Sequence, residues 1–341
     1  MERKYHIDLA KGIGILLVVF GHHDTILHPY IATFHMPLFF MLSGLFHPSI
    51  LSFSTFAKRR ARQLIIPYFC FAIILFLFWL IVGKGMGMSS NQDVSVMESF
   101  MGIFTATRID GFSNIGWGGT MWFLPCLFVV CCMYHLIASC SKKDIILFNI
   151  GSVLLGMTLM RIFHIRLPWS FITALMALPF YTFGNLFRQY ILDTKPHRSN
   201  CKDIIILLTF SLTSYLLGAR YGMINMVSNR YYNLFLFFVG GIAGSLVLIN
   251  LLKFIKAGHW KLINFLGMNT LVILAFHLRA KSLIEFIYPK ITHTAYDETN
   301  IPIAIISVVV EIVLCTPLIY IINRYFPFLV GRQKHVEKGN K

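Results

Sequence analysis

Charged residues are scarce in this chain. Asp, Glu, Lys and Arg make up 13% of its 341 residues, about half of the ~25% typical of soluble globular proteins. Acidic residues are scarcer still, with 14 Asp and Glu against 30 Lys and Arg, and the formal net charge is +16. A large solvated surface is therefore excluded. The 57% of hydrophobic residues stand in repeated apolar runs of about 20, which predict a helical membrane protein.

Signatures of disulfide-bonded, zinc-binding and nucleotide-binding proteins are also missing. The seven cysteines are an odd number, and the adjacent pair Cys131-Cys132 has no CxxC partner, so neither a disulfide framework nor a zinc site is indicated. The glycine-rich stretch 83–87 lacks the strand and helix start that a phosphate-binding loop needs. No small-x-small cleavage site follows the first apolar run, so we expect a retained first span rather than a signal peptide.

The apolar runs predict an all-α integral membrane protein with about ten transmembrane helices. Residues 1–330 are expected to form a single ten-helix membrane domain, followed by a basic cytoplasmic tail at 331–341. A short amphipathic segment near 94–106 is expected to lie at the membrane interface rather than cross it. The predicted spans lie near 7–27, 31–48, 64–83, 119–138, 145–161, 170–190, 204–219, 231–252, 262–280 and 301–322.

The distribution of basic residues predicts the orientation of these spans. With the N-terminus in the cytoplasm, 21 of the 30 Lys and Arg residues fall on the cytoplasmic side, in line with the positive-inside rule. Both termini are therefore expected to be cytoplasmic. The same rule accounts for the net charge, which in a soluble protein would point to nucleic acid. We expect a lipid bilayer and no nucleic acid as a partner.

The first predicted span carries ionisable residues near both ends. Lys11 and His22 are eleven residues apart, so on a continuous helix they share nearly one face, roughly 16 Å apart. Such groups inside a span are costly and usually functional, although Lys11 alone is also explained by snorkelling and His22 by a core hydrogen bond. Asp24 is a candidate for orienting an imidazole. A metal site at His22, His23 and Asp24 is disfavoured because adjacent helical residues face different sides, and no metal is expected.

A dense group of cations stands just before the third predicted span. An ordinary positive-inside loop accounts for it. The density also suits an anion cradle, because arginine binds phosphate through two parallel hydrogen bonds. The four residues are Lys58, Arg59, Arg60 and Arg62.

Five motifs are spread over the chain. They are Ile7-Asp8-x-x-Lys11-Gly12 with His22, the segment FHMPLFFMLSG at 34–44, Arg59-x-x-Arg62 before Pro67-Tyr68, Trp122-Phe123-Leu124, and LGMNTL at 266–271 leading to His277. With these motifs the chain resembles, over most of its length, the acyltransferase-3 family of integral membrane acyltransferases, which includes carbohydrate O-acetylases of bacterial envelopes. Members resembling this chain use a basic residue and a histidine at the spacing of Lys11 and His22. Lysine stands here where many carry arginine, and no hydrolase-like domain follows the tenth predicted span, as in stand-alone members.

The resemblance implies an acyl-CoA-dependent O-acyltransferase. Acetyl-CoA is the expected donor, no permanently bound cofactor is expected, and the pantetheine arm would run along the first span to bring the thioester to His22. His22 would act as general base on the acceptor hydroxyl or carry the acyl group itself; the sequence leaves both open. The expected acceptor is an envelope saccharide or its lipid-linked precursor, and the expected location is the bacterial inner membrane. The residues expected to hold the anionic head of the donor are Lys11, Arg59, Arg60 and Arg62.

Four further polar residues are candidates within the predicted spans. Glu311 is isolated in the middle of the tenth span at a cost of about 2.5–3.5 kcal/mol, so we expect it to face a polar cavity and to act in catalysis. His35 is expected either to contact substrate or to pair with a carbonyl freed by Pro37. Trp122 is either an interface residue or a platform for a sugar ring. His277 either binds the acceptor or is exposed at the surface.

A transporter is the alternative from another class. It would use His22, Glu311 and Lys11 as a proton relay for a small solute or a lipid-linked saccharide. Such carriers are commonly built from inverted repeats and interrupted helices, and neither is evident in the sequence. The arginine-dense segment before the third span favours the transferase.

Overall fold

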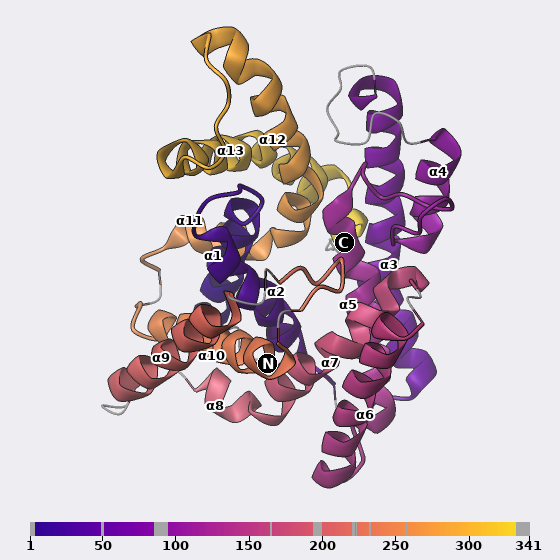
Figure 1. Ribbon diagram of the computed structural model, residues 1–341, viewed down its shortest axis with the longest axis vertical. Helices are drawn as coiled ribbons and strands as arrows, with labels where there is room; N and C mark the ends of the chain where they lie inside the picture. The colour runs from indigo at the N-terminus through magenta and orange to yellow at the C-terminus, as the bar shows by residue number, and fades with distance from the viewer. Residues whose placement is uncertain are drawn as a thin grey trace, which may run out of the picture.

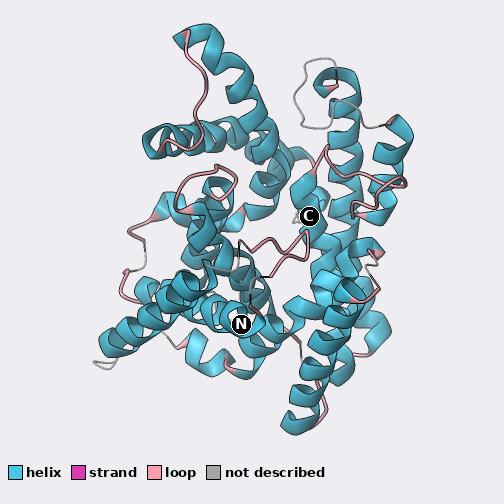
Figure 2. Cartoon of the chain, in the orientation of Figure 1, coloured by secondary structure: helices cyan, strands magenta, loops and turns pink. Residues whose placement is uncertain are grey.

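In the computed structural model of the chain, the described residues are mostly helical, joined by loops, with two isolated β-bridges and no strand (Figure 2). The basic tail predicted at 331–341 lies outside the described residues, apart from Gly331. The described residues are 4–48, 51–84, 95–163, 166–193, 200–219, 222, 224–231, 233–256 and 258–331.

Each of the ten predicted spans corresponds to one or two helices of the structure. The short segment expected near 94–106 forms a helix of its own, α4. The helices are α1 (Tyr5–Phe20), α2 (His28–Gly44), α3 (Phe53–Phe78) continued by the π-helix η1 (Trp79–Gly83), α4 (Val96–Thr105), the 3₁₀ turn η2 (Gly119–Trp122), α5 (Phe123–Ile137), α6 (Lys142–Arg161), η3 (Pro168–Ser170), α7 (Phe171–Leu186), α8 (Arg188–Leu192), α9 (Asn200–Gly218), α10 (Leu234–Leu252), α11 (Lys261–Met268), α12 (Thr270–Thr292), α13 (Ile301–Tyr325) and η5 (Pro327–Val330).

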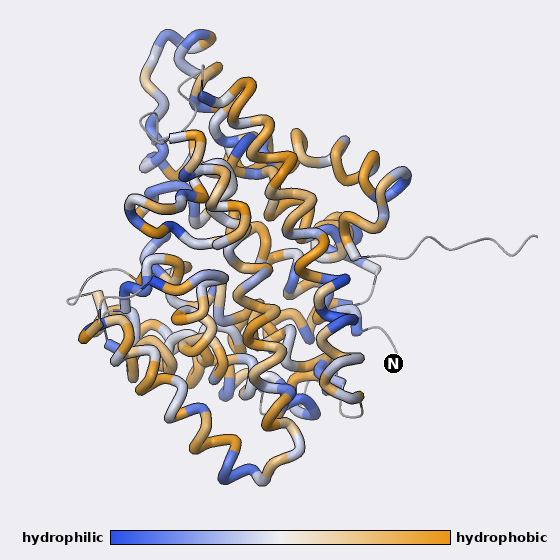
Figure 3. Tube along the Cα trace, turned by 90° about the vertical axis from the view of Figure 1, so that its right-hand side faces the viewer, coloured by the Kyte–Doolittle hydropathy of each residue, from blue (hydrophilic) through white to orange (hydrophobic). Residues whose placement is uncertain are grey.

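Within the described ranges, six helical segments are long and apolar enough to cross a membrane, and the bent pair α11–α12 makes a seventh if it is one span. Figure 3 shows hydrophobic residues along much of the length of the helices. α1, α2 and α7 are apolar but have only 16, 17 and 16 residues, or about 24–26 Å of helix, against a hydrocarbon core of ~30 Å. The all-helical membrane fold is confirmed, whereas the ten spans and the cytoplasmic termini stay predictions.

α1 and α2 lie in the middle of the molecule (Figure 1). In the same view α3 to α7 are on the right, α8 to α10 at the lower left, and α12 and α13 at the upper left. α1 packs against α2, α10, α11, α12 and α13. The helix that carries Lys11 is therefore enclosed by other helices.

Two glycines bring α1 and α11 into backbone contact. A Cβ on Gly12 would overlap the carbonyl oxygen of Ile263, and one on Gly267 would overlap that of Asp8. Any larger residue would push the two helices apart. This contact sets the chain that follows Gly267 against the face of α1 that bears Lys11.

The single span predicted at 262–280 is wrong in one respect, because α11 and α12 meet at 90°. Asn269 stands at the bend, where its amide nitrogen donates to the carbonyl of Phe265 at 2.8 Å. Its side-chain oxygen accepts a hydrogen bond from Asn323 of α13 at 2.7 Å. These polar contacts stabilise a break that the apolar pattern does not reveal.

Candidate active site

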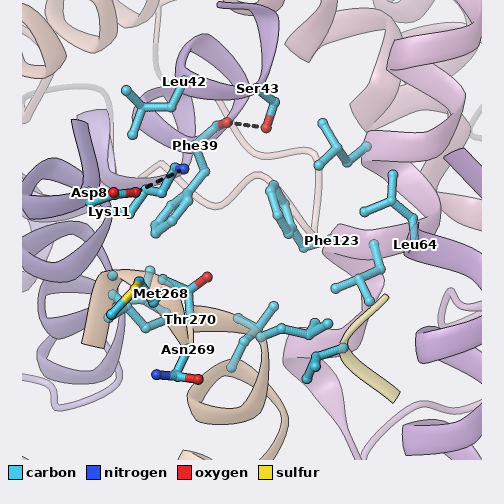
Figure 4. A pocket seen from close by; sticks show the side chains of 18 of the residues that line it. Asp8, Lys11, Phe39, Leu42, Ser43, Leu64, Phe123, Met268, Asn269 and Thr270 are labelled. Carbon is cyan, nitrogen blue, oxygen red and sulfur yellow. Dashed lines mark hydrogen bonds and ion pairs between the residues drawn. The ribbon is translucent and has the colours of Figure 1, made fainter. Parts of the chain in front are cut away.

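A cavity of about 740 Å³ lies beside α1, between α2, α3, α5 and the α11–α12 bend. Figure 4 shows Asp8 and Lys11 on one wall and Leu64 and Phe123 on the opposite one, with the bend residues below. The rest of the lining is largely apolar. We call this space the Lys11 cavity.

Two cations line the Lys11 cavity. Lys11 Nζ is 3.5 Å from Asp8 Oδ1 and 5.3 Å from the ring centre of Phe46, and its side chain is 31% exposed. Arg60 lines the cavity from α3, where its guanidinium lies 5.5 Å from the ring centre of Phe56. The Lys11 cavity is thus largely apolar, with two cationic side chains, Lys11 and Arg60, in its lining.

The other two arginines expected to hold the donor lie elsewhere on α3. Arg59 and Arg62 are exposed and do not line the Lys11 cavity. Residues three or four apart share a helix face, so Arg60 lies over Leu64, which also lines the cavity, while Arg59 and Arg62 share another face. The structure brings one of the three predicted arginines together with Lys11.

A second cavity, of about 150 Å³, contains the predicted histidine. His22, His28 and His35 line it together with Trp122 and the segment 224–227, and we call it the His22 cavity. The expectation of one continuous helix from Lys11 to His22 is wrong, because α1 ends at Phe20 and His22 lies in the turn that follows its C-cap, Gly21. The turn still places His22 just beyond the C-terminal end of α1, while Lys11 lies in the middle of that helix.

The two cavities adjoin each other. Val18 of α1, Met36 of α2 and Leu274 of α12 line both. Val18 is seven residues from Lys11 and four from His22. The cations and the imidazole predicted to cooperate therefore lie in neighbouring cavities along one helix.

A family model described as an acyltransferase domain matches residues 4–320, nearly the whole chain. The chain belongs to the acyltransferase-3 family. With its apolar helices, it is a membrane acyltransferase. No curated protein and no solved structure matched the chain.

In this acyltransferase, the turn that carries His22 is held from α12. Lys281 donates from Nζ to the backbone carbonyl of His22 at 2.6 Å. Lys281 itself pairs with Glu298 and with Glu285. The ring of His277, also on α12, has its centre 5.1 Å from that of His22. α12 therefore fixes both the backbone and the surroundings of the imidazole.

His277 and His35 have defined tautomers. Nδ1 of His277 lies 2.8 Å from the carbonyl oxygen of Ile273, and Nδ1 of His35 lies 2.9 Å from that of Ile31. Because a carbonyl oxygen can only accept a hydrogen bond, Nδ1 carries the proton in both rings. His277 is fully buried, which excludes the surface exposure considered for it, and its Nε2 has no partner among the described residues.

His35 is not the partner of the carbonyl that Pro37 frees. A proline leaves the carbonyl four residues before it without its helical donor, which here is that of Thr33, whereas His35 bonds Ile31. His35 also lines the His22 cavity, and its contact with substrate stays a prediction.

Glu311 of the acyltransferase makes a buried pair that the sequence did not predict. Its Oε1 lies 2.9 Å from Nε2 of His23, and both side chains are fully buried. The Tyr296 hydroxyl is 3.2 Å from Nδ1 of His23 and 2.9 Å from Oγ of Ser307, and burial raises the pKa of Tyr296. Glu311 lines neither the Lys11 cavity nor the His22 cavity. It anchors the turn after α1 to α13.

Asp24 and Trp122 both lie near the His22 cavity. Asp24 is exposed, and its carboxylate is 3.3 Å from Nδ1 of His28 rather than bonded to His22, so the imidazole that it orients is that of His28. Trp122 is 7% exposed and lines the cavity, so it is not an exposed interface residue. Thr120 donates to the carbonyl of Leu274 at 2.7 Å, which ties η2 to α12.

A metal centre finds no support in the described ranges, where no three His, Cys, Asp or Glu side chains come close enough to hold an ion. The side chains that line the His22 cavity and carry polar groups are three imidazoles, the Thr120 hydroxyl, the Asn225 amide and the Trp122 indole.

Proposed function

We propose that this acyltransferase transfers an acyl group from cytoplasmic acyl-CoA, with acetyl-CoA as donor, to a hydroxyl of an envelope saccharide or its lipid-linked precursor. The transfer takes place at the outer side of the bacterial inner membrane. The observation that carries the proposal is the pair of adjoining cavities, one with Lys11 and Arg60 and the other with His22, which share Val18, Met36 and Leu274.

The Lys11 cavity has the properties that an acyl-CoA requires. The phosphates of coenzyme A are anionic and its pantetheine arm is long and uncharged. The cavity combines two cations, of which Lys11 is paired with Asp8, with a largely apolar lining. Its volume of about 740 Å³ lies in the ~300–1,000 Å³ range of ligand pockets. Val18 lies two helical turns, ~10 Å, beyond Lys11. An arm that follows α1 from the cations reaches the boundary of the His22 cavity.

His22 is the proposed general base. It takes the proton of the acceptor hydroxyl as that oxygen attacks the thioester carbonyl, the C–S bond then breaks, and the proton passes to the departing coenzyme A thiolate. Such positioned proton transfer contributes typically about 10²–10⁴-fold. The ring of His277, whose centre lies 5.1 Å from that of His22, has an unprotonated Nε2 that can accept a hydrogen bond. An acyl-histidine intermediate on His22 remains the second route to the same product.

The test measures transfer of labelled acetyl groups from acetyl-CoA to envelope saccharides in membranes that contain the full-length protein. His22→Ala should lower the transfer at least ~100-fold, with unchanged protein level and unchanged thermal stabilisation by coenzyme A. His259→Ala, an exposed histidine outside both cavities, is the matched control and should retain activity. Normal transfer in His22→Ala would remove His22 from the mechanism, and no stabilisation of the parent protein by coenzyme A would reject the donor.

A further inference from the structure

A third cavity, of about 210 Å³, adjoins the His22 cavity. The two share Val227. Its walls come from three connections between helices, those after α4, before α7 and before α10. It lies on the His22 side of the acyltransferase, away from Lys11. We call it the Arg108–Arg166 cavity.

The lining of this cavity combines polar and apolar residues and carries an excess of positive charge. Arg108 and Arg166 both line it, and one carboxylate, Asp110, approaches them at 3.4 and 3.8 Å. Asp110 is 73% exposed and does not line the cavity. Two guanidinium groups therefore share one carboxylate. The uncharged polar residues of the lining are Thr107, Asn114, Ser170, Thr173, Ser228 and Asn229.

The backbone is strained around the same cavity. Five non-glycine residues of the described chain have positive φ, and four of them lie here: Ala106 at 52°, Trp169 at 60°, Ser170 at 50° and Asn229 at 52°. Ser170 and Asn229 line the cavity, and the other two directly precede residues that do. Non-glycine residues in this left-handed region are uncommon and unfavourable, and they concentrate at binding sites. Unfavourable backbone conformations in three separate connections around one cavity point to a wall shaped for a ligand.

Hydrogen bonds between the connections hold this wall in place. The Ser170 N–H donates to the Thr107 hydroxyl at 2.9 Å, and the Thr173 hydroxyl donates to Asn229 Oδ1 at 3.0 Å. Arg166 NH1 donates to the carbonyl of Arg108 at 3.3 Å. The cavity is thus a built feature rather than a gap between loops.

We propose that the Arg108–Arg166 cavity binds an anionic group of the acceptor saccharide and so presents a hydroxyl to His22; this rests on the proposed function. Hydroxyl and amide side chains suit any sugar, but two guanidiniums call for a carboxylate or a phosphate, which they bind in a planar, bidentate way. The volume of about 210 Å³ is below the ~300 Å³ of pockets that hold whole ligands. It fits one charged sugar residue of a larger acceptor.

The test uses the purified full-length protein in lipid nanodiscs and three probes, D-glucuronate, glucose 1-phosphate and D-glucose, with binding followed by saturation-transfer NMR. The two anions should bind at least ten times more tightly than D-glucose. Arg108→Gln and Arg166→Gln should each weaken anion binding about tenfold and leave D-glucose unchanged. The stronger of the two anions identifies the source of the charge as a uronate or a sugar phosphate.

Arg161→Gln is the matched control, because Arg161 is an exposed arginine at the end of α6 that does not line the cavity. Equal binding of all three probes, no binding of either anion, or the same loss in Arg161→Gln overturns the proposal. Thermal unfolding verifies that each variant is folded. If Arg166→Gln does not fold, it is replaced by Arg166→Lys, which keeps the charge but lacks the planar guanidinium. Coenzyme A binding is measured in parallel, so that failure of the donor site is distinguished from failure of the anion site.

Discussion

His23 and Glu311 are 288 residues apart in the sequence, yet their side chains meet at 2.9 Å in a fully buried place. The pair joins the turn after α1 to α13, one residue away from the proposed base. A buried carboxylate is costly unless it is paired, and Glu311 Oε2 has no further partner among the described residues. The position of His22 therefore depends on the contact between His23 and Glu311, and neither buried group is stable without the other.

Replacing Glu311 tests that dependence. Glu311→Ala leaves Nε2 of the buried His23 ring without its partner, and a buried polar group left unpaired costs about 1–3 kcal/mol. Glu311→Gln retains an acceptor for Nε2 and should cost less. We expect a lower temperature of thermal unfolding in the order parent, Gln variant, Ala variant, measured in detergent. Equal unfolding temperatures of the parent and the Ala variant would contradict the anchoring role.

The donor site gives a second prediction at the residue scale. Arg60→Gln removes a cation that lines the Lys11 cavity, and hydrogen bonds to charged groups are worth about 1.5–3 kcal/mol. We expect the KM for acyl-CoA to rise about tenfold or more, with a smaller effect on the KM for the acceptor. Arg62→Gln, on the exposed face of the same helix, is the control. A larger effect from Arg62 than from Arg60 would place the phosphates outside this cavity.

Residue types and spacing identified some of the functional groups that line the two cavities, but not their partners. Lys11, His22, His35 and Trp122 were predicted because polar and aromatic groups at those places are costly or unusual in a span. The partner of Glu311 was out of reach because nothing local connects it to His23. The choice of Arg60 over its neighbours depends on the helical phase, and α3 begins at Phe53, well before the span predicted from residue 64.

At the scale of elements, the contact between α1 and α11 determines the floor of the Lys11 cavity. Gly267→Ala would place a methyl group on the Asp8 carbonyl, and overpacking of this kind costs about 1–3 kcal/mol. We expect lower thermal stability and weaker stabilisation by coenzyme A. Gly151→Ala on α6, where nothing lies within 4 Å, is the control and should be neutral or stabilising by about 0.5–1 kcal/mol. Equal behaviour of the two variants would show that the helices separate freely.

The bend between α11 and α12 shows why elements are harder to predict than their residues. The apolar pattern runs through both helices, so it predicts one span at 262–280. The break depends on Asn269 and its hydrogen bond to Asn323, which is 54 residues away. The helix propensities of residues 262–280 cannot predict a hydrogen bond to a residue on another helix. The bend nevertheless supplies Met268, Asn269 and Thr270 to the cavity wall.

At the scale of the molecule, composition was sufficient to predict an all-helical membrane protein, whereas the orientation that the charge distribution indicates stays a prediction. The cavities were not predictable in shape, because they arise where α1, α2 and α12 meet α3 and α5. α1, α2 and α7 are apolar but shorter than a bilayer core, so length does not identify them as spans.

The predicted orientation is testable by chemical labelling of intact bacteria. Cys140, between α5 and α6, is exposed and is expected on the cytoplasmic side. Thr294, exposed between α12 and α13, is expected outside. In a background without other cysteines, a membrane-impermeant maleimide should label Thr294→Cys in intact cells and Cys140 only after permeabilisation. The opposite pattern would invert the topology and move His22 to the cytoplasmic side.

The three side chains that both cavities share have a consequence for the energised cell. An enzyme that passes an acyl group between two aqueous compartments could let protons leak across the membrane whenever its donor cavity is unoccupied. Val18, Met36 and Leu274 carry no group that relays a proton, and they stand where the donor side meets the acceptor side. If the proposed transfer across the membrane takes place, these three apolar side chains disfavour proton passage between the two cavities while no donor is bound.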